Sequence, residues 1–155
     1  MASTRMAGRL ALIIPSGLLG GALVSEYVFG LYPCEMCMWQ RWPHLAAIVF
    51  AIIALISRKQ NLSKLMLWGA ATAICASGLI GGFHAGVEYG WWEGITTCAT
   101  SGEVSLDSIM DAPLVRCDVA PWSLFGISLA GYNFLLSLGG AIAILMLLAK
   151  GRKDV

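Results

Sequence analysis

The chain has 155 residues, of which 58% are hydrophobic and only 12% are charged. Ordinary soluble domains carry roughly 25% charged residues, so this composition excludes a typical soluble protein and indicates one that is embedded in lipid. The net charge of +1 gives no basic surface for nucleic acid, because no basic patch gathers outside the short segments between apolar runs. The length allows one domain.

Four apolar stretches reach the roughly 20 residues that a helix needs to cross the hydrocarbon core. They cover approximately residues 10–31, 36–57, 65–85 and 122–149. The second would be too short if it began after Pro43, so we start it near Met36 and treat Pro43 as a kink of the kind that membrane helices tolerate. The fold class predicted is an all-α membrane protein, a bundle of four transmembrane helices that forms a single domain over residues 1–155.

Basic residues predict which face of the bundle is cytoplasmic. One face holds Arg5, Arg9, Arg58, Lys59, Lys64, Lys150, Arg152 and Lys153. The positive-inside rule places that face, and both termini with it, in the cytoplasm. The opposite face is then periplasmic and includes a long second loop over about residues 86–121. A cleaved signal peptide is the alternative for the N-terminal segment, but its apolar stretch is longer than the roughly 7–15 residues of such peptides and its removal would leave three crossings.

Two further patterns have packing interpretations. Gly17 with Gly21, and Gly78 with Gly82, are small residues spaced four apart, a spacing that lets helix backbones approach closely. Within the long loop, apolar and polar residues alternate over residues 104–111 in a way that a short helix resting on the bilayer could use.

The predicted topology sorts the five cysteines. Cys34 and Cys37 fall at the outer mouth of the second crossing. Cys98 and Cys117 fall in the long outer loop, so four cysteines face an oxidising compartment as two pairs. The loop pair could be a structural staple, but beside a second pair we favour thiol–disulfide exchange between the two. Cys75 lies mid-membrane, where we expect a dispensable small hydrophobe.

The C-x-x-C spacing of Cys34 and Cys37 brings two sulfurs within reach across one helical turn. Arg41 follows on the same helix face, so its cation and the positive end of the helix both favour a reactive thiolate. Arg41 could instead extend to lipid headgroups, but an ionisable residue beside a redox-competent pair favours a functional role. Zinc sites also use this spacing, but they need four ligands, and the possible companions His44 and His84 lie on different helices.

Three blocks of the sequence carry a resemblance to a known family. They are Pro33–Trp42, which contains Cys-x-x-Cys-x-x-x-Arg, then Phe83–Glu88, and Cys117–Trp122 continuing into Phe125–Asn133. Together they resemble the membrane oxidoreductases of the disulfide bond formation protein B (DsbB) type. The resemblance implies a four-helix bundle with a membrane quinone, ubiquinone or menaquinone, as electron acceptor. It also implies a periplasmic thioredoxin-like dithiol oxidase of the DsbA type as partner. We expect no metal, because the possible zinc ligands lie on different helices.

Matching positions imply the role of each cysteine. Cys34 and Cys37 would be the pair next to the quinone, with Arg41 as the cation on the quinone side. Cys98 and Cys117 would be the loop pair that the partner attacks. Electrons would then pass from the partner through the loop pair to the first pair and on to the quinone, as in a protein-dithiol:quinone oxidoreductase of the bacterial inner membrane.

Two other residues and two rival functions complete the expectations. By the same resemblance, His84 would border the quinone. Glu26 lies about two turns inside the first crossing, where a carboxylate is energetically costly, so it is either neutral or passes protons.

A buried carboxylate among short helices is also compatible with a proton-coupled exporter. An enzyme of the vitamin-K-epoxide-reductase type is the other rival, but there we expect the C-x-x-C motif late in the chain.

Overall fold

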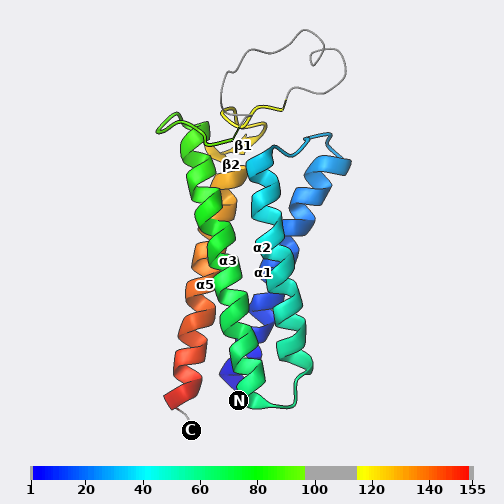
Figure 1. The fold of residues 1–155 in the computed structure, drawn as a ribbon, viewed down its shortest axis with the longest axis vertical. Helices are drawn as coiled ribbons and strands as arrows, with labels where there is room; N and C mark the ends of the chain where they lie inside the picture. The colour runs from blue at the N-terminus through cyan, green and yellow to red at the C-terminus, as the bar shows by residue number, and fades with distance from the viewer. Residues whose placement is uncertain (1, 97–114, 154–155) are drawn as a thin grey trace.

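A computed structural model describes residues 2–96 and 115–153. Its elements are α1 (Ala2–Tyr27), α2 (Glu35–Ile56), α3 (Gln60–Glu88), β1 (Ser123–Leu124), β2 (Ile127–Ser128) and α5 (Leu129–Lys153) (Figure 1). All four helices of the described residues are long and apolar enough to cross a membrane. The predicted fold, an all-α membrane protein with four spanning helices, is confirmed. Cys98 and the surface helix predicted over residues 104–111 lie outside the described residues.

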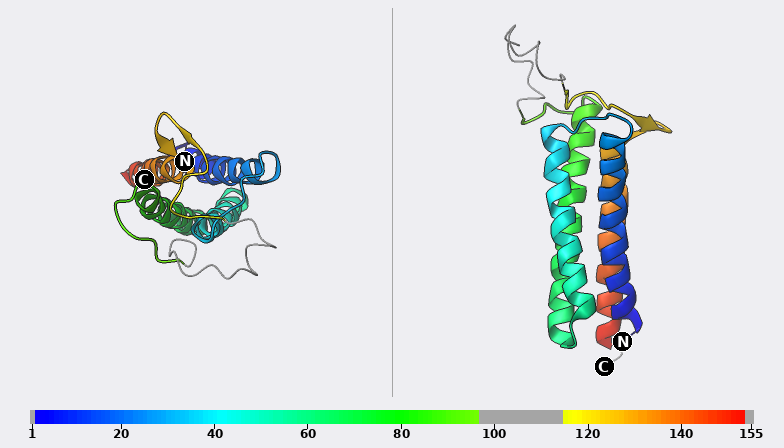
Figure 2. Two further views of the ribbon diagram at one scale, coloured as in Figure 1. Left: turned by 90° about the horizontal axis from the view of Figure 1, so that it is seen from above. Right: turned by 90° about the vertical axis from the view of Figure 1, so that its right-hand side faces the viewer.

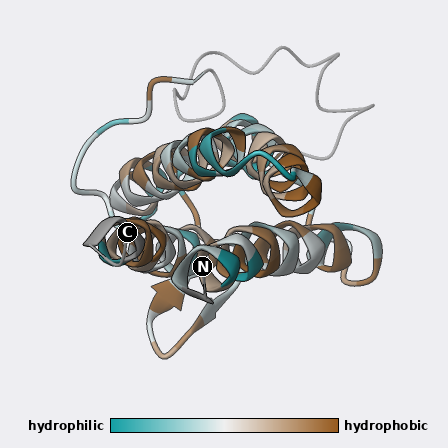
Figure 3. Ribbon diagram, turned by 90° about the horizontal axis from the view of Figure 1, so that it is seen from below, coloured by the Kyte–Doolittle hydropathy of each residue, from teal (hydrophilic) through white to brown (hydrophobic). Residues whose placement is uncertain are grey.

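The helices form a closed ring of four neighbours. α2 packs on α3, α3 on α5, α5 on α1, and α1 on α2, while α1 and α3 lie diagonally across the bundle (Figure 2). Both chain ends lie at one end of the bundle, and the connection from α1 to α2 and the β1–β2 hairpin lie at the other (Figure 1). Hydrophobic stretches occur on all four helices (Figure 3), and many of their large side chains are exposed, as lipid-facing side chains are.

Small residues pack the half of the bundle that holds the termini. Its buried core contains Ala7, Ala11, Ala47, Ala51, Ala54, Leu67, Ala70, Ala71, Ala141, Ile144 and Leu148. Without a hydrophobic driving force between helices in lipid, close approach of backbones is what gains van der Waals contact, and alanine permits it. This half of the bundle is therefore held together mainly by close packing.

The fourth helix begins later than predicted. We expected a crossing from about Trp122, whereas α5 begins at Leu129 and the preceding residues form the β1–β2 hairpin. Phe125 and Gly126 at its tip have φ angles of 52° and 76°, the left-handed pair that a tight two-residue hairpin requires. Ser128 then accepts a hydrogen bond from the first turn of α5, as a helix N-cap does. Hydropathy alone does not separate an apolar hairpin from the helix that follows it.

The two glycine pairs behave differently. A Cβ atom at Gly78 would lie 3.0 Å from Ser137, and one at Gly82 would lie 2.7 Å from an aromatic ring of α5. At Gly17 and Gly21 a Cβ atom would meet nothing within 4 Å. Close packing is thus confirmed for the α3 pair and wrong for the α1 pair, which instead lines a cavity.

Candidate redox centre and membrane cavity

The first cysteine pair lies at the N-terminal end of α2. Cys34 is the N-cap of the helix, with an extended backbone, and its Sγ accepts a hydrogen bond from the Cys37 N–H at 3.2 Å. Cys34 is only 4% exposed. The sequence motif therefore places both sulfurs at the positive end of the helix dipole, as expected.

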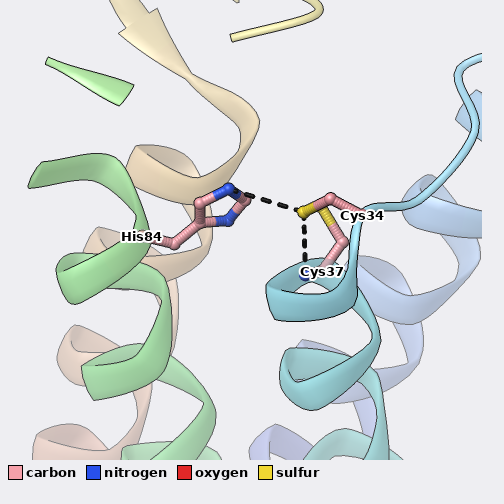
Figure 4. Close-up of side chains that lie close together, drawn as sticks. All are labelled: Cys34, Cys37 and His84. Carbon is pink, nitrogen blue, oxygen red and sulfur yellow. Dashed lines mark hydrogen bonds between the residues drawn. The ribbon is translucent and has the colours of Figure 1, made fainter. Parts of the chain in front are cut away.

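Cys34, Cys37 and His84 point toward one another from α2 and α3 (Figure 4). The Cys34 thiol donates to Cys37 Sγ at a sulfur–sulfur distance of 2.9 Å, and His84 Nε2 lies 3.6 Å from Cys34 Sγ. Donating to Cys37 raises the pKa of the Cys34 thiol above its usual range, and burial raises it further. Cys34 is thus the member of the pair that keeps its proton.

Gln40 fixes the orientation of His84. The Gln40 amide nitrogen donates to the Met36 carbonyl at 3.1 Å and lies 3.0 Å from His84 Nδ1. Since an amide NH₂ has two hydrogens and no acceptor, Nδ1 accepts the second one. The neutral imidazole then carries its hydrogen on Nε2, the nitrogen that faces the sulfurs. His84 therefore presents a hydrogen-bond donor to the cysteine pair.

Asn133 of α5 extends this network across the bundle. Its amide nitrogen donates to Gln40 Oε1 at 2.8 Å, and its Oδ1 accepts from Ser137 at 2.8 Å and lies 2.9 Å from His44 Nε2. A Cβ atom at Gly81 would lie 2.9 Å from the Asn133 amide, so only glycine leaves room for it. The network is buried and links three helices, and buried polar networks of this kind specify a unique arrangement when their atoms are satisfied.

Arg41 forms an ion pair with Glu26 across α1 and α2. A second guanidinium nitrogen donates to the Ala22 carbonyl at 3.4 Å. The cation is thus engaged with α1, whereas the His84 ring lies beside the Cys34 sulfur. The ion pair gives the Glu26 carboxylate a partner at a depth where an unpaired charge would be costly.

Two cavities meet at the cysteine pair. The inner cavity, about 240 Å³, lies between the helices. Its lining includes Cys37, Gln40, Arg41, His44, His84, Glu88 and Asn133. The outer cleft, about 320 Å³, is lined by Cys34, Cys37 and His84 together with Val115 and Arg116. Cys37 and His84 line both spaces, whereas Cys34 lines only the outer cleft.

The other three cysteines differ in how they lie relative to the first pair. Cys117 is buried and packs with Cys34 in an apolar cluster, so the structure brings one loop cysteine to the first pair. Cys98, its expected partner, lies outside the described residues. Cys75 is half-buried in α3 and packs against the alanine core at the other end of the bundle.

Three residues of the site, Gln40, Asn133 and Glu88, were not predicted from the sequence. All three line the inner cavity, and Glu88 Oε1 lies 3.8 Å from His84 Nε2. The signal that could have found them is the presence of polar residues inside apolar crossings, where they mark function by default. In the sequence, that signal drew attention only to Glu26 and Arg41.

The structure also bears on the alternative of a zinc site. The ligand atoms of Cys34, Cys37 and His84 all lie within 4.8 Å of one another. Within the part of the chain that is described, this group has three members, one fewer than a structural zinc site uses. We retain thiol chemistry as the interpretation of the motif.

Comparison with known proteins places the chain in a family. The family model named disulfide bond formation protein DsbB matches residues 4–147. The chain belongs to the DsbB family. It is a multi-pass membrane protein of disulfide bond formation and, as the family name implies, a disulfide-forming oxidoreductase. The DsbB family is generally quinone-linked.

Individual relatives agree with this assignment. Disulfide bond formation protein B of Acidovorax sp. is 28% identical over 146 residues, which are 86% of this chain and 81% of that protein. Disulfide bond formation protein B of Chromohalobacter salexigens is 41% identical over 78 residues, which are 50% of this chain and 45% of that protein. An uncharacterized protein of Rickettsia prowazekii is 29% identical over 128 residues, 77% of this chain and 73% of its own. No solved structure matches the chain significantly.

Proposed function

We propose that this DsbB-family protein reoxidises a periplasmic thioredoxin-like dithiol oxidase of the DsbA type and passes the electrons to a membrane quinone, ubiquinone or menaquinone. The observation that carries the proposal is that Cys37 and His84 line both the outer cleft and the inner cavity. One thiol pair can therefore exchange disulfides on its outer side and lose electrons on its inner side.

On the outer side, disulfide exchange requires a chain of thiolate attacks. A thiolate of the reduced partner attacks the Cys98–Cys117 disulfide and forms a mixed disulfide, which releases one loop thiol. That thiol attacks the Cys34–Cys37 disulfide and becomes bonded to Cys34, and the second partner thiol resolves the mixed disulfide, so the partner leaves oxidised. The loop thiol released in this step then displaces the Cys34 thiol and re-forms the Cys98–Cys117 disulfide. Attack at Cys34 fits its place on the outer cleft and its packing against Cys117.

Attack at Cys34 leaves Cys37 as the departing thiolate. Cys37 is the member of the pair that faces the inner cavity, and it stands at the N-terminal end of α2. The helix dipole and the Nε2–H of His84 both stabilise a negative charge at this place. The chain thus directs the electron pair toward the inner cavity.

The inner cavity fits a quinone ring. An apolar cavity of about 150 Å³ accepts benzene, so about 240 Å³ is enough for a substituted ring. Arg41 lines the cavity, and its buried Nε has no hydrogen-bond partner among the described residues, so it is a donor available to a ring carbonyl. When bound there, a quinone would take up two electrons and two protons. The exposed Gly17 and Gly21 of the lining open the cavity toward lipid.

The energetics favour a quinone over a thiol pool as acceptor. DsbA-type oxidases have reduction potentials of about −120 mV, so passing their electrons to a thiol pool at about −200 mV would be uphill in free energy by about 4 kcal/mol. A membrane quinone as acceptor avoids this unfavourable change in free energy. We place the enzyme in the bacterial inner membrane with the cysteine end periplasmic. The basic residues expected inside by the positive-inside rule lie near the two chain ends and around the connection from α2 to α3, and these segments lie at the same end of the bundle (Figure 1).

The test is catalytic thiol consumption by the purified full chain. With a reduced DsbA-type oxidase and added ubiquinone, we expect continuous loss of partner thiols together with quinone reduction. Replacing Cys34, Cys37, Cys98 and Cys117 by serine abolishes it, whereas Cys75→Ser retains it. An exporter would keep its transport activity without the four cysteines. Failure of the intact protein to reduce quinone would contradict the proposal.

A further inference from the structure

His44 is a polar residue of the inner cavity to which neither the DsbB assignment nor the proposed electron path gives a role. It lies on α2 one turn deeper than Arg41, is 3% exposed, and lines the same cavity. Its Nδ1 atom is buried and has no hydrogen-bond partner among the residues that the structure describes. Because a buried polar atom without a partner is costly, Nδ1 is an atom that a ligand in the cavity can satisfy.

The network around His44 determines which ring nitrogen carries the hydrogen. Nε2 lies 2.9 Å from Asn133 Oδ1, an oxygen that can only accept, so Nε2 donates. The Ser77 hydroxyl, 3.0 Å from Nε2, donates its own hydrogen to the Gln40 carbonyl at 2.8 Å and so can only accept from the ring. A neutral imidazole has one N–H, which leaves Nδ1 as an acceptor.

Arg41 and His44, which both line the inner cavity, therefore carry opposite hydrogen-bonding groups. The two residues are three apart on α2 and share one helix face. Within the described part of the chain, Arg41 Nε is a donor without a partner and His44 Nδ1 is an acceptor without one. A donor pairs with a carbonyl oxygen, whereas an acceptor pairs with a hydroxyl. The cavity is thus equipped for both forms of a ring that alternates between carbonyl and hydroxyl.

We propose that His44 accepts, through Nδ1, a hydrogen bond from the ring hydroxyl of a quinol in the inner cavity, and so gives the site a contact specific to the reduced ligand. This inference rests on the proposed function and adds to it a binding residue and a preference between redox forms. No covalent or redox step is involved, since the hydrogen stays on the ring oxygen. The oxidised ring has no hydroxyl and does not make this bond.

Nitrogen NMR of the histidines tests the inference directly, because the chain has only two of them. Full-length protein labelled with ¹⁵N-histidine, its cysteines oxidised, is studied in detergent without oxygen, and His84→Gln assigns the signals. We expect His44 in the Nε2–H tautomer, with Nδ1 at a pyridine-type position. Trimethylhydroquinone should move the Nδ1 signal toward the pyrrole-type position, and its dimethyl ether should not. An Nδ1–H tautomer, or an unmoved signal at saturating trimethylhydroquinone, overturns the inference.

Two substitutions separate ligand contact from support of the network. His44→Gln places an amide near the position of Nε2 and removes the acceptor at Nδ1, whereas His44→Asn places an amide near Nδ1. By calorimetry, His44→Gln should weaken trimethylhydroquinone binding about fivefold to tenfold and change trimethylbenzoquinone binding by less than about twofold, while His44→Asn keeps the preference for the hydroquinone. Ser137→Ala, which removes a network hydroxyl away from the cavity, is the control and should change neither affinity.

The outcomes distinguish this inference from the proposed function. If the wild-type protein binds neither trimethylhydroquinone nor trimethylbenzoquinone, both are overturned. If it binds trimethylbenzoquinone and reduces it during turnover, but His44→Gln leaves both affinities unchanged or lowers both equally, only the inference about His44 falls.

Discussion

Near the chain ends the four helices meet through alanines, whereas at the opposite end they meet through a cysteine pair, two histidines and a network of amides and hydroxyls. The terminal half gains stability from close approach of backbones. The cysteine half instead contains a cavity and an ion pair between α1 and α2. The comparison teaches that in this small bundle the groups for chemistry are concentrated at the end where polar side chains, rather than alanines, join the helices.

The largest effect should come from the cysteines of the cysteine half. We expect Cys37→Ser to reduce partner oxidation to the background rate, because the pair can then neither receive nor pass on an electron pair. Cys75→Ser changes a cysteine packed against the alanine core and should leave the rate near that of the wild type. The rate of thiol loss with a reduced DsbA-type oxidase measures both. Similar loss in the two variants would remove the distinction between the halves.

The sequence predicted the framework and the cysteines better than it predicted the cavity. Hydropathy and the basic residues were enough for four crossings, because the bilayer sets the length of an apolar helix. Spacing was enough to place Cys34 and Cys37 at a helix start. The contact of His84 with the sulfurs, and the role of Asn133 in the network, depend on how α3 and α5 rotate against α2. Such rotations are set by packing, which a single sequence does not reveal.

A second prediction concerns the ion pair of the cysteine half. Arg41→His shortens the cation, leaves Glu26 with a weaker partner and removes the Nε donor from the cavity. We expect quinone reduction to fall by about tenfold to a hundredfold, with the Cys34–Cys37 disulfide still able to form. Arg5→His at the terminal end is the matched control and should have little effect. Unaltered quinone kinetics in Arg41→His would refute the role of this cation.

A third prediction uses glycines as probes of free space. Gly78→Leu would push a side chain into Ser137 of α5 and should lower the stability of the bundle by roughly 1–3 kcal/mol, as overpacking does. A Cβ atom at Gly21 would meet no atom of the described residues within 4 Å, so Gly21→Leu should leave stability unchanged while partly filling the inner cavity. Thermal unfolding in detergent and binding of trimethylbenzoquinone measure the two effects. Tight quinone binding by Gly21→Leu would show that the cavity is not the site.

A fourth prediction concerns proton affinity at the outer cleft. Because the Cys34 thiol donates to Cys37, its pKa is raised, so alkylation of Cys34 should need a more alkaline solution than an ordinary thiol does. Cys37→Ala removes the largest cause and leaves burial, so the pH at which Cys34 becomes reactive should fall toward the ordinary value. The rate of iodoacetamide labelling of Cys34 against pH measures this, with Cys75, Cys98 and Cys117 changed to alanine in both proteins. An equal or more alkaline profile in Cys37→Ala would contradict the assigned donor.

The smallest effect should come from the exposed ion pair that flanks Cys117. Arg116 binds both carboxylate oxygens of Asp118, at 2.9 and 2.6 Å, and lowers the pKa of that carboxyl. A depressed carboxyl pKa stabilises the fold above the unfolded value, about 3.9, and this contribution is lost as the pH falls through the folded value. Since both groups face solvent, Asp118→Asn should not measurably change thermal unfolding at neutral pH.

The same pair does lie at the rim of the outer cleft, where a charge acts on approach of a partner rather than on folding. Arg116→Gln should therefore change the rate of association with the oxidase by a few-fold at low salt, and the difference should vanish at high salt because exposed charges are screened. Stopped-flow measurement at two ionic strengths decides it. A salt-independent loss of rate would mean that Arg116 acts on the sulfurs themselves. Arg116 would then belong to the redox centre rather than to the rim of the outer cleft.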